Sequence, residues 1–269
     1  MESIATDVLN AELISREDLN ETLSIVRVRP DGGRVPDFQP GQFVRLGLPK
    51  PDQGAPTAGR PGRVRMTRRA YSIASSPLTT DHLEFFVVRI EEGALTPRLW
   101  EIPVGGRLWM DSQAKGEFTI DLAPPGADLV MVSTGTGIAP FLSMLRTYAE
   151  NRPWRRFVLI NGARYASDLG YRDELERVCR GDESVRYIPL VTREPEGSPW
   201  TGLRGRVQTV LEPEMYERLA GVPLDPARAH VFLCGNPDMI DTVEAMLVAR
   251  GFVTDTHQQK GNIHFERYW

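Results

Sequence analysis

Hydrophobic and polar positions alternate over short stretches in the first 122 residues. Ile25, Arg27 and Arg29, for example, alternate with Val26 and Val28, and this period of two is typical of a β-strand. Pro-Gly and Gly-Gly sequences, which favour turns, separate such stretches. The strands expected from the pattern are 23–30, 42–48, 68–75, 82–90, 107–113 and 117–122. Six short strands with intervening turns predict an antiparallel barrel or sandwich.

The pattern changes near residue 123, where longer apolar runs begin to alternate with helical segments. The expected strands are 127–134, 156–161, 185–192, 230–236 and 262–266, and the expected helices are 139–150, 171–180, 207–220 and 237–250. Alternation of strands and helices at this spacing predicts a parallel sheet, here of five strands, with helices on both faces. The chain is therefore expected to hold a β domain over 1–122 and an α/β domain over 123–269.

Local sequence signals add three details to this outline. Residues 49–64 are rich in proline and glycine and predict a surface loop. A short helix is expected over 96–101, with Thr96 as its N-cap and Pro97 as its first residue. Gly251 is expected to end the last helix.

Composition narrows the class of protein. The chain has 269 residues, 41% of them hydrophobic, and a net charge of −4, values typical of a globular protein. No apolar run approaches the roughly 18 residues of a membrane span, and the acidic N-terminus does not resemble a signal peptide. Two cysteines, Cys179 and Cys234, are too few for a disulfide framework, a four-thiolate zinc site or an all-cysteine iron–sulfur cluster. With so few cysteines, a reducing cytoplasm is the expected compartment. The four histidines have no metal-ligand spacing, so we expect no bound metal.

Arginine dominates the positive charge. Of 32 basic residues only Lys50, Lys115 and Lys260 are lysine. The stretch 53–80 has no acidic residue, yet it holds Arg60, Arg63, Arg65, Arg68 and Arg69. An acidic protein with one basic stretch is not a general nucleic-acid binder, but the stretch could dock a single acidic partner.

A glycine turn follows the first expected strand of the α/β domain. Its sequence is Thr134-Gly135-Thr136-Gly137, and a helix comes next. Glycine lets a backbone approach a ligand closely, and a helix N-terminus favours phosphate. The turn lacks both the third glycine of the dinucleotide fingerprint and the Gly-Lys of a P-loop. A tight turn that needs glycine only for steric reasons is therefore an equally good interpretation.

A second glycine turn opens the last expected helix. It reads Cys234-Gly235-Asn236-Pro237-Asp238 and again follows a strand. Because ligands bind beyond the carboxyl ends of parallel strands, both turns would face the same crevice. A single cysteine such as Cys234 is usually just a small buried hydrophobe, but two glycine turns together favour a ligand site.

The β domain offers an anion site of a different kind. Arg69-Ala70-Tyr71-Ser72 lies in an expected strand, so alternation puts Arg69 and Tyr71 on one face. An exposed cross-strand pair would account for these residues equally well. About twenty residues later, however, a Gly-Ala-Leu-Thr turn ends at Thr96 and starts a short helix with free N–H groups. Two anion-binding devices and an aromatic ring suggest a bulky diphosphate ligand.

In this order the motifs resemble the ferredoxin–NADP⁺ reductase family of flavoproteins, and the resemblance covers nearly the whole chain. The matching segments are 40–43 (PGQF), 69–72 (RAYS), 93–96 (GALT), 135–137 (GTG) and 234–237 (CGNP). The chain end, Glu266-Arg267-Tyr268-Trp269, is similar to the bacterial branch of the family, which ends in an aromatic pair. The resemblance implies a six-stranded antiparallel β-barrel for FAD and a five-stranded parallel sheet for NADP(H).

The resemblance also implies roles for residues around FAD. Arg69 would hold the diphosphate, Tyr71 would pack on the isoalloxazine and Ser72 would hydrogen-bond near N5. Tyr268 and Trp269 would cover the flavin ring and the adenine. The full set implied for FAD is Arg69, Ala70, Tyr71, Ser72, Phe86, Ala94, Leu95, Thr96, Thr134, Tyr268 and Trp269.

For NADP(H) the resemblance implies contacts from both glycine turns and from three arginine segments. The two turns would supply Gly135, Thr136, Gly137, Gly235, Asn236, Pro237 and Asp238. Cations for the 2′-phosphate would come from Ala163-Arg164, Thr192-Arg193 and Arg206, with Arg204 as a possible substitute for Arg206. Three solvated arginines that are incidental to the site would be the alternative.

The implied activity is hydride transfer between NADPH and FAD N5, followed by single-electron transfer to ferredoxin or flavodoxin. Ser72 and Cys234 would lie near the nicotinamide, and Glu266 would relay a proton or steady the ring. We expect a cytoplasmic monomer with no nucleic-acid or membrane partner. An NAD(P)H-dependent flavin reductase serving an oxygenase or cytochrome, a noncatalytic nucleotide-binding module, and FMN in place of FAD remain alternatives.

Overall fold

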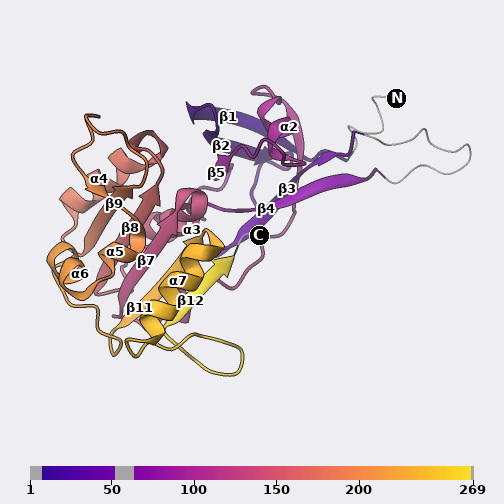
Figure 1. Ribbon diagram of the computed structural model, residues 1–269. Coiled ribbons are helices and arrows are strands. Elements are labelled where there is room, and N and C mark those ends of the chain that lie inside the picture. Colours follow the sequence, from indigo (N-terminus) through magenta and orange to yellow (C-terminus); the bar gives the residue numbers. More distant parts are fainter. Residues whose placement is uncertain (1–7, 52–63, 268–269) are drawn as a thin grey trace, which may run out of the picture. The chain divides into compact units, whose positions relative to one another are not determined.

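The computed structural model describes residues 8–51 and 64–267 (Figure 1). The chain divides into two compact units, Met1–Glu117 and Phe118–Trp269, so that the division falls five residues before the end of the β domain expected from the sequence. Each unit is described separately below. No helix in the described part of the chain is both long and apolar enough to cross a bilayer.

The first unit is a six-stranded antiparallel sheet, as the alternating pattern predicted. Its strands are β1 (Ala11–Asn20), β2 (Leu23–Pro30), β3 (Phe43–Pro49), β4 (Met66–Ser72), β5 (Leu83–Val88) and β6 (Arg107–Met110), in the order β4-β3-β6-β1-β2-β5. Beyond β4, Ala74 N donates to Glu84 O on β5 at 2.8 Å. The two outer strands therefore meet, and the sheet curls into a barrel around an apolar core that includes Val28, Leu46 and Phe85.

One of the six strands expected in this unit was wrong, and β1 was missed. Residues 117–122 form no strand; they contain the short 3₁₀ helix η1 (Ile120–Leu122). The apolar signal there comes from packing within the second unit, where the Phe118 ring lies 5.5 Å from that of Phe232. β1 lacks a clear alternation because none of its positions after Leu13 is buried, so polar side chains are tolerated over most of the strand.

The short helix of this unit, α2 (Thr96–Trp100), begins at the expected place, but Thr96 is not its N-cap. Leu95 occupies the cap position. The Thr96 hydroxyl instead accepts a hydrogen bond from Ile90 N at 2.9 Å and donates to Ile90 O at 3.2 Å. Thr96 therefore fastens the turn that precedes the helix.

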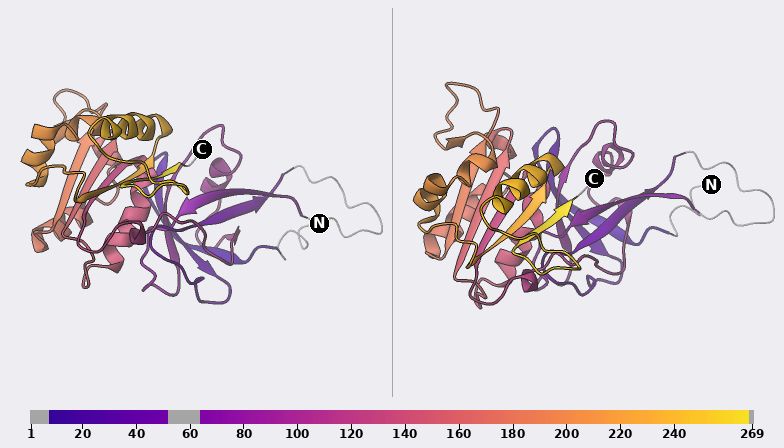
Figure 2. Two further views of the ribbon diagram at one scale, coloured as in Figure 1. Left: turned by 90° about the horizontal axis from the view of Figure 1, so that it is seen from below. Right: turned by 60° about the horizontal axis from the view of Figure 1, so that its bottom comes forward.

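The second unit is a parallel sheet with helices on both faces (Figure 2). Its strands are β7 (Asp128–Thr134), β8 (Arg156–Ala163), β9 (Val185–Val191), β10 (Leu203–Arg204), β11 (Ala229–Gly235) and β12 (Ile263–Arg267), in the order β10-β9-β8-β7-β11-β12. The sheet has six strands, one more than the five expected. With two residues, β10 is too short to show a period in the sequence.

The helices of the second unit follow the expected segments with one exception. They are α3 (Ala139–Thr147), α4 (Arg172–Gly181), α5 (Val207–Val210), α6 (Pro213–Ala220) and α7 (Pro237–Val248). The single helix expected over 207–220 is split, because Glu212 is extended (ψ 139°) before Pro213 and a residue before proline avoids the helical region. Gly251 was expected to cap α7, but Ala249 is the C-cap; Gly251, at φ 87°, lies two residues further on in the turn that follows.

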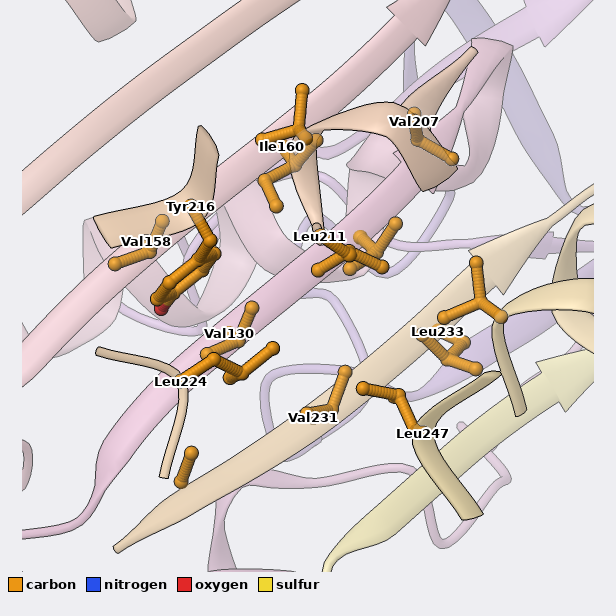
Figure 3. Packing of buried hydrophobic residues seen from close by; sticks show 14 of the residues in the cluster. Val130, Val158, Ile160, Val207, Leu211, Tyr216, Leu224, Val231, Leu233 and Leu247 are labelled. Carbon is orange, nitrogen blue, oxygen red and sulfur yellow. The ribbon is translucent and has the colours of Figure 1, made fainter. Parts of the chain in front are cut away.

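The core of the second unit lies between the sheet and helices α5, α6 and α7. Side chains of Val130, Ile160 and Val231 point from three strands toward Leu211 and Leu247 on the helical layer (Figure 3). These positions alternate along each strand, so the opposite set of residues is buried on the other face. The sheet is thus a rigid platform, and its carboxyl edge holds the loops that the sequence marked for binding.

Candidate nucleotide-binding sites

Strand β4 presents the Arg-Ala-Tyr-Ser motif in the first unit. It pairs with β3 without a register shift, from Met66 opposite Pro49 to Ser72 opposite Phe43. Alternation therefore puts Arg69 and Tyr71 on one face. Arg69 is exposed and Ser72 is buried.

Tyr71 is half-buried beside the barrel core. Its ring meets the edge of Phe85 at 6.3 Å between centroids. The hydroxyl oxygen is buried and has no hydrogen-bond partner among the described residues, and burial raises the pKa of Tyr71 well above its ordinary value of 10. An orphaned buried hydroxyl is costly, so this tyrosine is a position where a bound ligand would supply a missing partner.

A basic pocket of about 600 Å³ joins the two anion-binding segments of this unit. Arg69 from β4 and Ala94 from the turn before α2 both line it, although they are 25 positions apart in sequence. The described residues that line it are Lys50, Val64, Arg65, Met66, Thr67, Arg68, Arg69 and Ala94. Four of these eight residues are cationic and none is acidic, so the pocket has the charge that a diphosphate requires.

The other residues expected around FAD contribute less directly. Leu95 is 1% exposed and belongs to the barrel core, and the Thr96 hydroxyl is occupied by Ile90, so from this turn only Ala94 lines the pocket. Phe86 is 4% exposed on β5, on the opposite face from Phe85. Tyr268 and Trp269 lie outside the described residues.

Sequence reasoning assigned Arg65 and Arg68 to partner docking and missed their place in this pocket. The Arg68 guanidinium also stacks on Trp109, 3.8 Å from the ring centroid. The signal that could have placed Arg65 and Arg68 in an anion site is the stretch 53–80, which is rich in arginine and has no acidic residue. Arg60 and Arg63, which belong to the same run, lie outside the described residues.

The two glycine turns of the second unit are in direct contact, as their strand-end positions predicted. Strands β7 and β11 are neighbours, with Ser133 beside Cys234. Asn236 N donates to the Thr134 hydroxyl oxygen at 2.9 Å, joining one turn to the other. The turn after β7 continues as the 3₁₀ helix η2 (Gly135–Ile138) into α3.

The glycines in these turns serve two purposes. A Cβ on Gly137 would lie 2.3 Å from Cys234 O, and a Cβ on Gly235 would lie 2.3 Å from the Thr134 hydroxyl, so both glycines permit the contact between the turns. Gly135 is different, because it has φ 54° and no heavy atom of the described residues lies within 4 Å of the place where its Cβ would be. Among the three glycines of these turns, Gly135 alone thus has backbone that no described residue covers.

The start of α7 already has its cap. The Asn236 side chain accepts hydrogen bonds from Asp238 N at 2.8 Å and Met239 N at 3.3 Å. Pro237 and Asp238 occupy the first turn, where an acidic side chain interacts favourably with the positive end of the helix dipole. These contacts explain the motif structurally and leave less room for an anion there.

Two of the three expected catalytic residues lie side by side. Glu266 on β12 is the register partner of Cys234 on β11. Cys234 is fully buried and Glu266 is half-buried. Ser72 belongs to the first unit.

The three arginine segments meet along the carboxyl edge of strands β8, β9 and β10. Thr192 N donates to Ala163 O at 3.1 Å, and Arg193 N donates to Arg164 O at 2.8 Å. Gly205 N, just before Arg206, donates to Val191 O at 2.8 Å. Segments that are about thirty and fifteen residues apart in sequence thus become neighbours.

The side chains of Arg164, Arg193 and Arg206 are exposed. None of the three guanidinium groups makes a hydrogen bond or ion pair with another described residue. Arg204 differs, because its guanidinium donates to Glu194 O, Pro195 O and the Ser198 hydroxyl. The expectation that Arg204 could replace Arg206 therefore finds no support, since its donors are already used.

A curled antiparallel barrel with a basic pocket, followed by a parallel sheet with paired glycine turns and three arginines that pair with no described residue, is the arrangement expected of a two-unit nucleotide-binding oxidoreductase. Residues 131–245 match the family model described as "Oxidoreductase NAD-binding domain". The chain is 35% identical over 265 residues to ferredoxin–NADP reductase B of Sorangium cellulosum, covering 98% of this chain and 99% of that one. It is 33% identical over 256 residues to ferredoxin–NADP reductase of Pseudomonas aeruginosa, covering 91% of each.

A solved structure agrees with these relatives. A ferredoxin NADP⁺ reductase from Neisseria gonorrhoeae with bound FAD and NADP superposes with a TM-score of 0.81 at 27% identity, covering 97% of this chain and 98% of that one. The chain belongs to the ferredoxin–NADP reductase family.

Proposed function

We propose that the protein is an FAD-dependent NADPH:ferredoxin/flavodoxin oxidoreductase. The observation that supports this most strongly is the meeting of Arg164, Arg193 and Arg206 at one sheet edge, where their guanidinium groups pair with no other described residue. Guanidinium forks bind phosphate in pairs of hydrogen bonds. Three of them suit the 2′-phosphate that distinguishes NADPH from NADH.

The residues of the first unit fit FAD. The basic pocket accepts a diphosphate, with Arg69 as the main cation and Ala94 at the opposite segment. Tyr71 would flank the isoalloxazine, and Ser72 would hydrogen-bond near N5. When bound, FAD supplies the change from two-electron to one-electron chemistry.

The residues of the second unit would orient the nucleotide. Gly135 offers open backbone to the dinucleotide, and the contact between the turns holds Thr134 and Gly235 in place. Cys234 would lie beside the nicotinamide. Glu266, its neighbour on β12, would hold a proton or steady the ring there.

The proposed partner is an acidic one-electron carrier, ferredoxin or flavodoxin. The relatives' names include both carriers. Arg65 and Arg68 supply a basic rim on which such a carrier could dock. We also propose that the protein works as a cytoplasmic monomer, without a nucleic-acid or membrane partner.

Anaerobic titration of the purified yellow protein with NADPH, and separately with NADH, tests this function. The absorbance of the oxidised flavin should bleach with NADPH at much lower concentration than with NADH. The reduced protein should then reduce ferredoxin or flavodoxin. A preference for NADH, with transfer only to free flavin, an oxygenase or a cytochrome, would instead favour a flavin reductase component.

A further inference from the structure

Glu194 connects all three arginine segments of the second unit. Its carboxylate Oε2 accepts a hydrogen bond from Ala166 N at 2.7 Å, two residues after Arg164. Its carbonyl oxygen accepts from the Arg204 guanidinium, two residues before Arg206. Glu194 itself directly follows Arg193. One residue therefore contacts the loops that hold the other two arginines.

The backbone alone does not align these loops. Hydrogen bonds between the ends of β8 and β9 stop at Arg193 N to Arg164 O. Beyond that point the Glu194 side chain joins the two loops. A small apolar cluster of Ala163, Leu169, Val191 and Trp200 lies beneath them, and Trp200 Nε1 donates to Leu203 O at 3.1 Å. The loops thus rest on a packed base, with Glu194 as the polar link above it.

An acidic side chain next to three arginines would ordinarily weaken anion binding. Glu194, however, makes no ion pair with Arg164, Arg193 or Arg206 in the described part of the chain, because Ala166 N holds its carboxylate. The arginines stay available to an external anion. The hydrogen bond from Ala166 N thus does two things: it holds the Glu194 carboxylate in place, and it aligns the two loops.

We propose that Glu194 is a positioning residue that aligns Arg164, Arg193 and Arg206 for the 2′-phosphate of NADPH. This proposal rests on the proposed function. Glu194 does not touch the nucleotide; it acts through the loops to which it is bonded. Its removal should therefore weaken recognition of the phosphate and spare the rest of the dinucleotide.

The test measures binding to the purified flavin-loaded protein by isothermal titration calorimetry. The probes are adenosine 2′,5′-bisphosphate, which has the 2′-phosphate, and 5′-AMP, which lacks it. Glu194→Ala should weaken binding of the bisphosphate about tenfold, the scale of one lost hydrogen bond to a charged group. Binding of 5′-AMP should not change. In turnover, the KM for NADPH should rise, while kcat and the KM for NADH stay the same.

Two further variants separate positioning from general loss of structure. Glu194→Gln keeps an oxygen acceptor for Ala166 N and should bind the bisphosphate like the wild type. Ala166→Pro removes the donor and keeps the carboxylate, so it should lose bisphosphate affinity like Glu194→Ala. Proline suits this position because Tyr165 is extended (φ −127°, ψ 159°) and Ala166 is the first residue of the 3₁₀ helix η3 (Ala166–Asp168).

Glu196→Ala is the matched control, since it removes an exposed acid of the same loop. It should leave bisphosphate affinity unchanged or slightly higher. The proposal is overturned if Glu194→Ala keeps wild-type affinity, if it weakens both probes equally, or if Glu194→Gln behaves like Glu194→Ala. If the wild type itself binds both probes alike, the proposed preference for NADPH fails first and this proposal fails with it.

Discussion

Gly137 packs its backbone directly against the carbonyl of Cys234, so closely that a Cβ there would lie 2.3 Å from the carbonyl oxygen and 2.6 Å from the carbonyl carbon. The two residues are 97 positions apart in sequence. Because backbone atoms cannot move aside as the end of a side chain can, this contact restricts position 137 to glycine. The stability of the second unit should therefore depend on how closely the two turns pack.

Gly137→Ala should therefore lower the free energy of unfolding by about 1–3 kcal/mol, the usual cost of forcing extra volume into a packed site. Denaturant unfolding followed by circular dichroism measures this change. Gly181→Ala is the control, since nothing lies near its Cβ position at the end of α4, and it should be neutral. Equal stability of Gly137→Ala and the wild type would contradict the described contact.

Arg69→Gln should lower the FAD content of the purified protein. The substitution removes one of the two β4 cations of the basic pocket, and a hydrogen bond to a charged group contributes about 1.5–3 kcal/mol. The ratio of flavin to protein absorbance after dialysis measures retention. Arg29→Gln, on β2 and paired with Glu12, removes an equal charge elsewhere in the barrel and should retain FAD. Full retention by Arg69→Gln would show that the pocket does not hold the diphosphate.

Arg65→Glu distinguishes two roles for Arg65: docking of the electron carrier, and binding of FAD in the basic pocket. If this arginine docks the carrier, ferredoxin reduction should slow and its dependence on salt should flatten, while turnover of NADPH with ferricyanide persists. Stopped-flow kinetics at several ionic strengths, with FAD content measured in parallel, distinguish the cases. A parallel fall in both rates together with lost FAD would assign Arg65 to the pocket and remove it from docking.

Arg206→Gln should raise the KM for NADPH about tenfold or more and leave the KM for NADH unchanged, since one charge-assisted contact to phosphate contributes about 1.5–3 kcal/mol. Steady-state kinetics with both nucleotides provide the comparison. Arg204→Gln should behave differently, because its guanidinium holds Glu194 O and Pro195 O. We expect it to lower the melting temperature as well as phosphate affinity. Identical effects of the two variants would argue against this division of roles.

Two stacked histidines, the buried His264 and the half-buried His230, make the stability of the second unit depend on pH. His264 Nε2 and His230 Nδ1 are 3.0 Å apart, and their rings stack. Burial, together with the neighbouring His230, holds the pKa of His264 well below its ordinary value of 6.5, although Asp255 at 3.6 Å opposes the shift. Burial also lowers the pKa of His230.

As pH falls through 6.5, these histidines therefore bind protons in the unfolded chain but remain neutral in the folded chain. The free energy of unfolding should fall as pH drops below 6.5, by at most about 1.4 kcal/mol per pH unit for each proton. Unfolding midpoints between pH 5 and 8 test this. His264→Gln should flatten the dependence, while His257→Gln, at an exposed position, should leave it unchanged. An unaltered slope in His264→Gln would assign the effect to other groups.

Periodicity and local turn chemistry determined most of the architecture. The antiparallel strands of the first unit and the alternating strands and helices of the second follow from side-chain spacing, which a single segment displays by itself. The same local logic located the glycine turns and the arginines. It failed at β1, at 117–122 and at β10, where a strand is too polar or too short to show a period, or where apolar side chains are buried by a distant partner.

Only the tertiary structure decided which residues act together. Local sequence cannot show that Gly137 must lie against Cys234, or that Arg69 and Ala94 share one pocket. Nor can it show that the Arg204 guanidinium has partners in its own loop, while that of Arg206 has none among the described residues. Nor does any pattern mark Glu194, an ordinary acidic loop residue until folding brings Ala166 and Arg204 to it. Hydrogen bonds and steric exclusion act over a few ångströms in space, and only the folded chain defines which atoms come within that range.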